Sequence, residues 1–169
     1  MTANAAIGGG ILRTSPAADH LVVRVEGTEY GIPMSSVREV SSAQVPTMVP
    51  GLPDYIRGVV WFGGRPTPVV DPARFMKGPL LEFSDRSCLL YIGDVESESV
   101  IAVLIDGIVG VLDAAVAYEQ KGRKKKSPLL SPAFILREGK RVVVMHVQTL
   151  FDGHGNGGRA VRGGKGKPV

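Results

Sequence analysis

The chain has 169 residues, of which 44% are hydrophobic, 21% charged and 6% aromatic. This balance is ordinary for a globular domain, so collagen, a coiled coil and whole-chain disorder are excluded. No apolar run approaches about 18 residues, and residues 1–10 lack the basic start and apolar stretch of a signal peptide, so we expect a cytoplasmic protein. The single cysteine, Cys88, excludes a disulfide framework, and its apolar surroundings predict a buried side chain.

The formal net charge of +4 is concentrated in two short segments. Residues 121–126 hold five cations and residues 153–169 hold four, which leaves a net charge of −5 on the rest of the chain. Either segment is suited to bind nucleic acid or an anionic membrane. No aromatic side chains are interleaved in residues 121–126 to stack on bases, so a solvated loop is the favoured interpretation. An acidic protein partner fits this run equally well.

From Leu21 onward, apolar and polar residues alternate over short stretches, which is typical of strands with one buried face. Residues 21–25 and 30–32 predict a hairpin. Residues 34–40 predict one or two helical turns, because two serines precede valines spaced by three. Three prolines then predict an extended loop before residue 58.

The second half of the chain predicts further short strands separated by turns. Gly63-Gly64 joins two strands, Asp71-Pro72 opens a short helix, and Asp106-Gly107 predicts a tight turn. The strands are predicted at residues 58–62, 65–70, 88–92, 100–105, 108–112, 133–136 and 141–147, followed by a stub at 148–151. The chain is therefore predicted to be mostly β, with strands at barrel-like spacing and little helix.

Both ends have compositions that disfavour a packed core. Residues 1–20 contain a glycine triplet, and residues 153–169 contain seven glycines among charged residues. We expect a disordered N-terminal arm at 1–20, a folded domain at 21–152 and a disordered tail at 153–169.

The sequence offers no evident catalytic, cofactor or metal site. Residues 153–158 match the dinucleotide pattern G-x-G-x-x-G, but no helix-forming sequence follows them. The histidines at 20, 146 and 154 lack metal-ligand spacing, and His146 is predicted to be a half-buried strand residue. Asp71 and Asp106 end strands, but a turn former follows each, so a turn role is favoured over catalysis. We expect no enzymatic activity, no cofactor and no metal.

Four segments together carry a more specific signal. They are Val37-Arg38-Glu39-Val40, Val49-Pro50-Gly51-Leu52-Pro53-Asp54-Tyr55-Ile56-Arg57-Gly58-Val59, Arg65-Pro66-Thr67-Pro68-Val69-Val70-Asp71 and Ala102-Val103-Leu104-Ile105-Asp106-Gly107-Ile108-Val109-Gly110-Val111-Leu112. In this order they resemble the CheW-like domain, an adaptor that couples chemoreceptors to the histidine autokinase CheA. The resemblance covers residues 21–151.

The resemblance implies a fold of two intertwined five-stranded β-barrels of the Src-homology-3 type, and a protein that is not an enzyme. It implies that a surface of the first barrel docks the regulatory domain of a CheA-type kinase. An apolar groove between the barrels would take the cytoplasmic tip of a chemoreceptor. The receptor-side candidates carried over are Val37, Glu39, Gly58, Ile108 and Val111, although aliphatic strand residues more often lie in the core.

One segment departs from the family pattern. Where the family usually has Asn-Leu-Arg-Gly, this chain has Trp61-Phe62-Gly63-Gly64, so the arginine associated with coupling is missing. Trp61, Phe62 and Arg65, which stands two positions after the expected arginine, are further interface candidates. We interpret Trp61 as a core residue, because exposure of so much apolar surface is disfavoured.

The leading hypothesis is a non-catalytic scaffold of a bacterial chemosensory system. We expect it to retain kinase docking and to couple to receptors more weakly or differently. The alternative is a module that binds nucleic acid or an anionic membrane through its basic loop and tail, with the barrel as a platform. An enzyme built on a β-barrel is the least favoured hypothesis.

Overall fold

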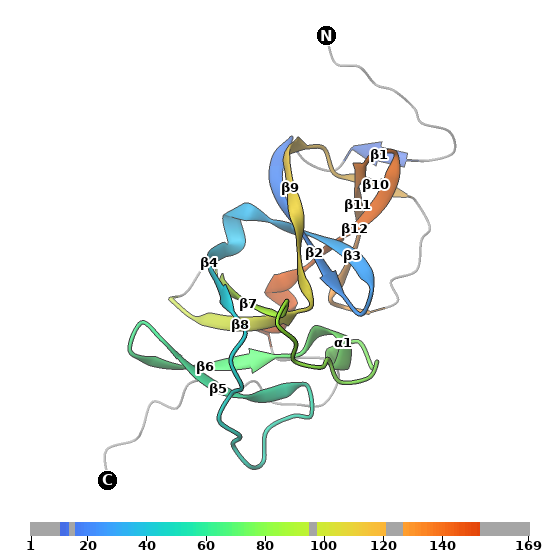
Figure 1. The fold of residues 1–169 in the computed structure, drawn as a ribbon. Helices are drawn as coiled ribbons and strands as arrows, with labels where there is room; N and C mark the ends of the chain where they lie inside the picture. Colours follow the sequence, from blue (N-terminus) through green and yellow to red (C-terminus); the bar gives the residue numbers. More distant parts are fainter. Residues whose placement is uncertain (1–10, 14–15, 95–97, 121–126, 153–169) are drawn as a thin grey trace.

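The computed structural model describes residues 11–13, 16–94, 98–120 and 127–152, which form two β-sheets with little helix (Figure 1). The seven-stranded sheet has the order β1-β10-β11-β12-β3-β2-β9, and the five-stranded sheet has the order β4-β7-β8-β6-β5. The elements are β1 (Ile11–Arg13), β2 (Ala18–Val25), β3 (Thr28–Pro33), the 3-10 helix η1 (Met34–Ser36), β4 (Val37–Ser42), β5 (Ile56–Phe62), β6 (Arg65–Val70), α1 (Pro72–Phe75), β7 (Cys88–Gly93), β8 (Val100–Ile105), β9 (Gly107–Ala115), β10 (Tyr118–Gln120), β11 (Leu130–Arg137), β12 (Lys140–Met145) and the 3-10 helix η2 (Val147–Leu150).

The chain passes from one sheet to the other and back again. Strands β2 and β3 belong to the seven-stranded sheet, β4 to β8 build the five-stranded sheet, and β9 to β12 return to the first. The predicted mostly β fold of two intertwined units is therefore confirmed. The difference is that the short strands β1 and β10 extend one of the two five-stranded units to seven strands.

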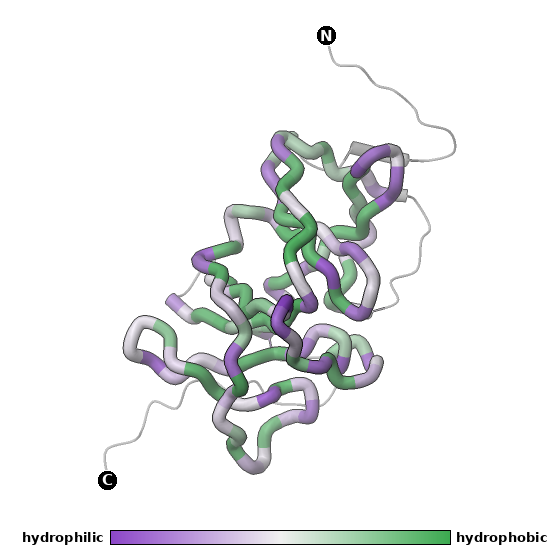
Figure 2. The backbone as a smooth tube through the Cα atoms, in the orientation of Figure 1, coloured by the Kyte–Doolittle hydropathy of each residue, from purple (hydrophilic) through white to green (hydrophobic). Residues whose placement is uncertain are grey.

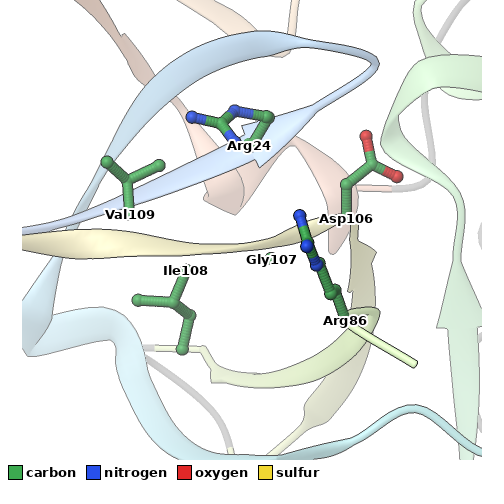
Figure 3. Close-up of a pocket in the computed structure, with 6 residues that line it drawn as sticks. All are labelled: Arg24, Arg86, Asp106, Gly107, Ile108 and Val109. Carbon is green, nitrogen blue, oxygen red and sulfur yellow. The ribbon is translucent and has the colours of Figure 1, made fainter. Parts of the chain in front are cut away.

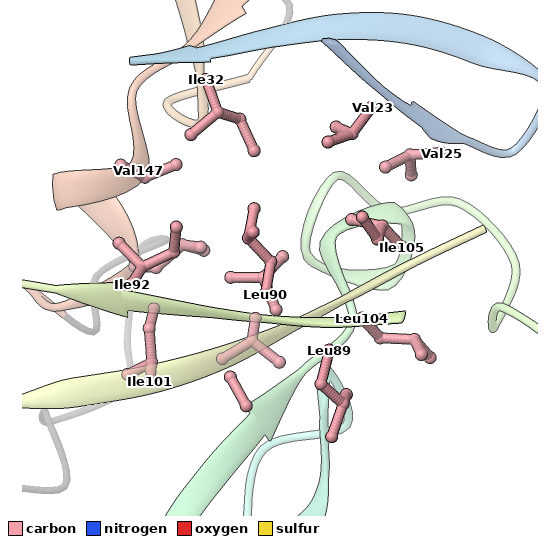
Figure 4. Packing of buried hydrophobic residues seen from close by; sticks show 14 of the residues in the cluster. Val23, Val25, Ile32, Leu89, Leu90, Ile92, Ile101, Leu104, Ile105 and Val147 are labelled. Atoms are coloured by element: carbon pink, nitrogen blue, oxygen red, sulfur yellow. The ribbon is translucent and has the colours of Figure 1, made fainter. Parts of the chain in front are cut away.

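The two sheets share one large hydrophobic core. Val23 and Ile32 from the seven-stranded sheet pack in the same cluster as Leu90 and Ile92 from the five-stranded sheet (Figure 4). Many hydrophobic residues lie on the strands in the region between the sheets, and many hydrophilic residues lie at the turns (Figure 2). The other face of β2 contributes Val22 to a second, smaller cluster. Strand β2 is thus buried on both faces, whereas its alternating sequence predicted only one.

The helix predicted over residues 34–40 is wrong beyond Ser36. Only Met34–Ser36 forms a helical turn, and Val37–Ser42 is strand β4, which pairs antiparallel with β7. The register shifts between Val37 and Glu39, so Arg38 is the extra residue of a bulge. Pairing with β7 therefore overrides the local helical spacing of the valines.

The predicted disorder of residues 1–20 is also wrong in part. Residues Ile11–Arg13 pair with β10, and β2 begins at Ala18 and pairs with β9 from that residue onward. Residues 1–10 and 14–15, the basic run at 121–126 and the predicted tail at 153–169 lie outside the described residues.

Both turns predicted from short sequence signals, at Gly63-Gly64 and at Asp106, are present, but only the first joins the two strands of a hairpin. The hairpin of β5 and β6 turns at Gly63 and Gly64, whose φ angles of 56° and 74° fit a two-residue type I′ turn. Asp106 makes the predicted turn, but β8 and β9 on either side of it belong to different sheets. The Asp106 carboxylate accepts a hydrogen bond from the Glu26 N–H at 2.6 Å, and the Asp106 N–H donates to the Arg24 carbonyl at 2.9 Å. This residue therefore fastens the crossover to the β2–β3 hairpin.

Candidate protein-interaction surfaces

A buried ion pair fixes the start of α1. The register of β5 shifts between Ile56 and Gly58, and the bulged residue Arg57 donates a 2.9 Å hydrogen bond to the fully buried Asp71 carboxylate. The same carboxylate accepts hydrogen bonds from the N–H groups of Arg74 at 3.1 Å and Leu81 at 2.8 Å. Asp71 is the N-cap of α1, as its place before Pro72 predicted. Its hydrogen-bonding capacity is committed to the fold, which indicates a structural role.

The loop formed by residues 43–55 is held against β5. The backbones of Thr47 and Val59 exchange two hydrogen bonds of 2.9 Å. Gly58 lies beneath this contact with a φ of 136°, and a Cβ on it would stand 2.8 Å from the Thr47 carbonyl carbon. Glycine is required here by both space and conformation. This receptor-side candidate is buried, so its role in the structure is to allow the loop to approach β5.

Trp61 is not a core residue, contrary to the sequence interpretation. Its side chain is 70% exposed, whereas that of its neighbour Val60 is 4% exposed. Alternation along β5 directs the two residues to opposite faces of the sheet. Phe62 returns to the inner face, where its ring stacks on that of buried Tyr91 with centroids 4.1 Å apart. The strand therefore uses phenylalanine for packing and leaves tryptophan in solvent.

Two further exposed apolar side chains lie on the loop that pairs with β5 at Thr47 and Val59. Val45 is 81% and Met48 85% exposed, on either side of the Thr47 contact. Thr47 and Val59 form an isolated antiparallel bridge, so the loop that carries Val45 and Met48 lies beside the strand that carries Trp61. We call Val45, Met48 and Trp61 the Trp61 patch. Val45 and Met48 could not be recognised as candidates from the sequence, because they lie in a proline-punctuated loop with no apolar periodicity.

Strand β9 presents a second exposed apolar surface. Ile108 is 44% and Val111 50% exposed, although residues three apart on a regular strand point to opposite faces. The register with β2 shifts between Val22 and Val23, and Val109 is the extra residue on β9. This bulge turns Ile108 to the same side as Val111, and Val109 packs on the smaller core. The structure thus brings these two receptor-side candidates together.

The remaining candidates, Val37, Glu39 and Arg65, lie on β4 and β6 of the five-stranded sheet. Val37 is half-buried and Glu39 is exposed on β4, which belongs to the other sheet. Arg65 is exposed at the start of β6, directly after the glycine turn and paired with Phe62. A side chain in place of Gly63 would need a positive φ, so this turn disfavours the arginine of the family pattern.

Cys88 and His146 both differ from their predicted positions in how exposed they are. Cys88 is half-buried rather than buried as predicted, and desolvation raises the pKa of its thiol, which lowers its reactivity. His146 follows β12 and is exposed, whereas a half-buried strand position was predicted. The described residues contain no group of three or more metal-ligating side chains. Among those same residues, no helix is long and apolar enough to span a membrane.

Comparison with known proteins identifies close parallels for this arrangement. The family model of the CheW-like domain matches residues 19–154. The chain is 25% identical over 134 residues to a chemotaxis protein CheW of Bacillus subtilis (strain 168), covering 78% of this chain and 85% of that protein. It is 30% identical over 102 residues to protein FrzA of Myxococcus xanthus, covering 60% and 62% respectively. The crystal structure of scaffolding protein TtCheW from Thermoanaerobacter tengcongensis has the same fold, with a TM-score of 0.72, 17% identity and coverage of 86% of this chain and 98% of that one.

Proposed function

The chain belongs to the CheW-like domain family, and from this membership we propose that it is a non-catalytic cytoplasmic adaptor of chemosensory signalling. In this role it docks the regulatory domain of a CheA-type histidine kinase and couples the kinase to the tip of a chemoreceptor. Holding both partners on one domain raises their effective concentration. A change of receptor state can then bias the kinase through differential contacts.

The exposure of the Trp61 patch is the observation that carries the proposal of kinase docking. A tryptophan that is 70% exposed, with Val45 and Met48 more exposed still, is costly in water and is typical of an interface anchor. The patch lies on β5 and its covering loop, at one edge of the five-stranded sheet. We therefore assign kinase docking to this sheet, rather than to the sheet in which the described chain begins.

Receptor coupling is assigned to Ile108 and Val111 on β9. Both side chains are exposed and on one side of the strand, which suits the apolar face of a helical partner. The guanidinium expected at residue 63 is absent, and Arg65 is displaced to the far side of the turn. A charged hydrogen bond lost from an interface lowers affinity, so we propose that receptor coupling is weaker than kinase docking.

Trp61→Ala should lower the affinity for the kinase regulatory domain at least tenfold and leave the free energy of unfolding within about 1 kcal/mol of the native value. The side chain contributes little to the core because it is mostly solvated. Titration calorimetry with the isolated regulatory domain and urea denaturation measure the two effects. Leu136→Ala, at a 40% exposed position on the other sheet, is the matched control and should change neither.

If Trp61→Ala lowered the free energy of unfolding by as much as it weakened the free energy of kinase binding, the patch assignment would be contradicted.

The same titration tests the nucleic-acid and membrane alternative. Deletion of residues 153–169 should leave kinase affinity within about threefold, since the patch lies in the folded domain. Loss of kinase binding on that deletion would favour a function that resides in the basic tail.

A further inference from the structure

A pocket of about 340 Å³ opens beside the exposed end of β9 (Figure 3). It is formed where β2, the crossover after β8 and the segment before β7 meet. Its lining residues are Arg24, Arg86, Asp106, Gly107, Ile108 and Val109. The pocket therefore joins the side chain of Arg86 to the apolar surface that Ile108 begins.

The two arginines that line this pocket differ in how far they are neutralised. The guanidinium of exposed Arg86 has no hydrogen bond or ion pair within the described part of the chain. Arg24 is half-exposed and lies 3.4 Å from a Glu29 carboxylate oxygen. Glu29 is shared with Arg137, whose guanidinium is 3.3 Å from its other oxygen. Arg24 is thus already paired, and Arg86 is the cation of this pocket that remains open to an anion.

The carboxylate already in the pocket is engaged elsewhere. Asp106 accepts the short hydrogen bond from the Glu26 N–H, which ties it to the β2–β3 turn. No ion pair between Asp106 and Arg86 is present in the described structure. The planar fork of Arg86 is therefore available to a carboxylate from outside, for which guanidinium geometry is well matched.

We propose that this pocket binds an acidic side chain of the chemoreceptor tip, in the register that packs the tip's apolar face on Ile108 and Val111. The inference rests on the proposed function, because it assigns a polar anchor to the same receptor surface. An apolar strip beside a cationic pocket selects a helix that carries a carboxylate next to its apolar face. Arg86 thereby supplies a cation to a receptor surface whose expected coupling arginine is missing.

The test uses the full-length chain and a purified chemoreceptor hairpin tip from the same organism. Arg86→Glu should weaken tip binding at least tenfold, and Arg86→Lys should weaken it less, because lysine keeps the charge but loses the bidentate geometry. Lys140→Glu, an equal charge reversal at an exposed residue of the β11–β12 hairpin, is the control and should stay within twofold. Raising the salt concentration should weaken the native pair more than the Arg86→Glu pair.

Charge-swap variants of the tip identify the anchor directly. A single acidic residue of the tip changed to lysine should restore at least part of the affinity lost in Arg86→Glu.

Ile108→Asp tests the receptor surface itself and should abolish tip binding. If Ile108→Asp abolishes binding but Arg86→Glu leaves it within twofold, the pocket assignment is wrong and the proposed function stands. If Ile108→Asp has no effect, the receptor surface itself is wrongly placed. If Arg86→Glu instead reduces binding of duplex DNA and spares the tip, the pocket is a phosphate site and the inference fails.

Discussion

Asp71→Asn is expected to reduce the free energy of unfolding by about 3 kcal/mol, because it leaves a partly buried guanidinium without its counter-ion. Asp71 is fully buried and accepts hydrogen bonds from Arg57 and from the N–H groups of Arg74 and Leu81. The amide keeps the shape of the carboxylate but has one acceptor oxygen instead of two. Urea denaturation followed by fluorescence measures the loss.

Asp54→Asn provides the matched comparison. Asp54 forms an ion pair with Arg74 at 2.6 Å, but its side chain is 63% exposed. Exposed pairs contribute at most about 1 kcal/mol, so this variant should unfold close to the native protein. Equal destabilisation by the two substitutions would show that burial is not what makes the Asp71 pair important.

Gly58→Ala is expected to cost about 3 kcal/mol or more, since it combines a steric clash with backbone strain. The added Cβ would meet the Thr47 carbonyl group, which is itself held in place by the two hydrogen bonds to Val59. The φ of 136° is also unfavourable for alanine. Thermal denaturation monitored by circular dichroism gives the change.

Gly110→Ala is the control for a glycine in a strand. A Cβ at Gly110 meets no heavy atom within 4 Å, and its φ lies outside the range that favours glycine. We expect a stability change below about 1 kcal/mol at this position. A Gly58→Ala protein as stable as this control would mean that the loop over β5 moves aside at little cost.

Features with short-range signals were predicted well from the sequence. The Gly63-Gly64 turn specified the β5–β6 hairpin, and Asp71-Pro72 specified the start of α1. Each depends on the conformational preferences of two to four adjacent residues. The arrangement of the strands in two packed units was expected only from the resemblance to a known family, because the local signals carry no information about it.

Features that depend on distant pairing were missed. Residues 37–42 have valines at helical spacing, yet hydrogen bonds to β7, about fifty residues later, make them a strand. The bulges at Arg57 and Val109 decide which side chains enter the ion pair and which face the solvent, and neither has a recognisable sequence mark. The large apolar side chain of Trp61 favoured burial, but the alternation of side chains along β5 places it on the solvent-exposed face.

The passage of the chain between the sheets constrains how this protein folds during synthesis. Strand β3 pairs in parallel with β12, which is near the C-terminal end of the described chain, and β2 pairs with β9. The β2–β3 hairpin emerges early from the ribosome, but its partner β9 begins only at Gly107 and its partner β12 only at Lys140. The five-stranded sheet, whose strands are contiguous in sequence, can assemble first and serve as a template for the other. Such late closure predicts slow folding, and it leaves the apolar hairpin exposed to aggregation and to capture by chaperones until β12 is available.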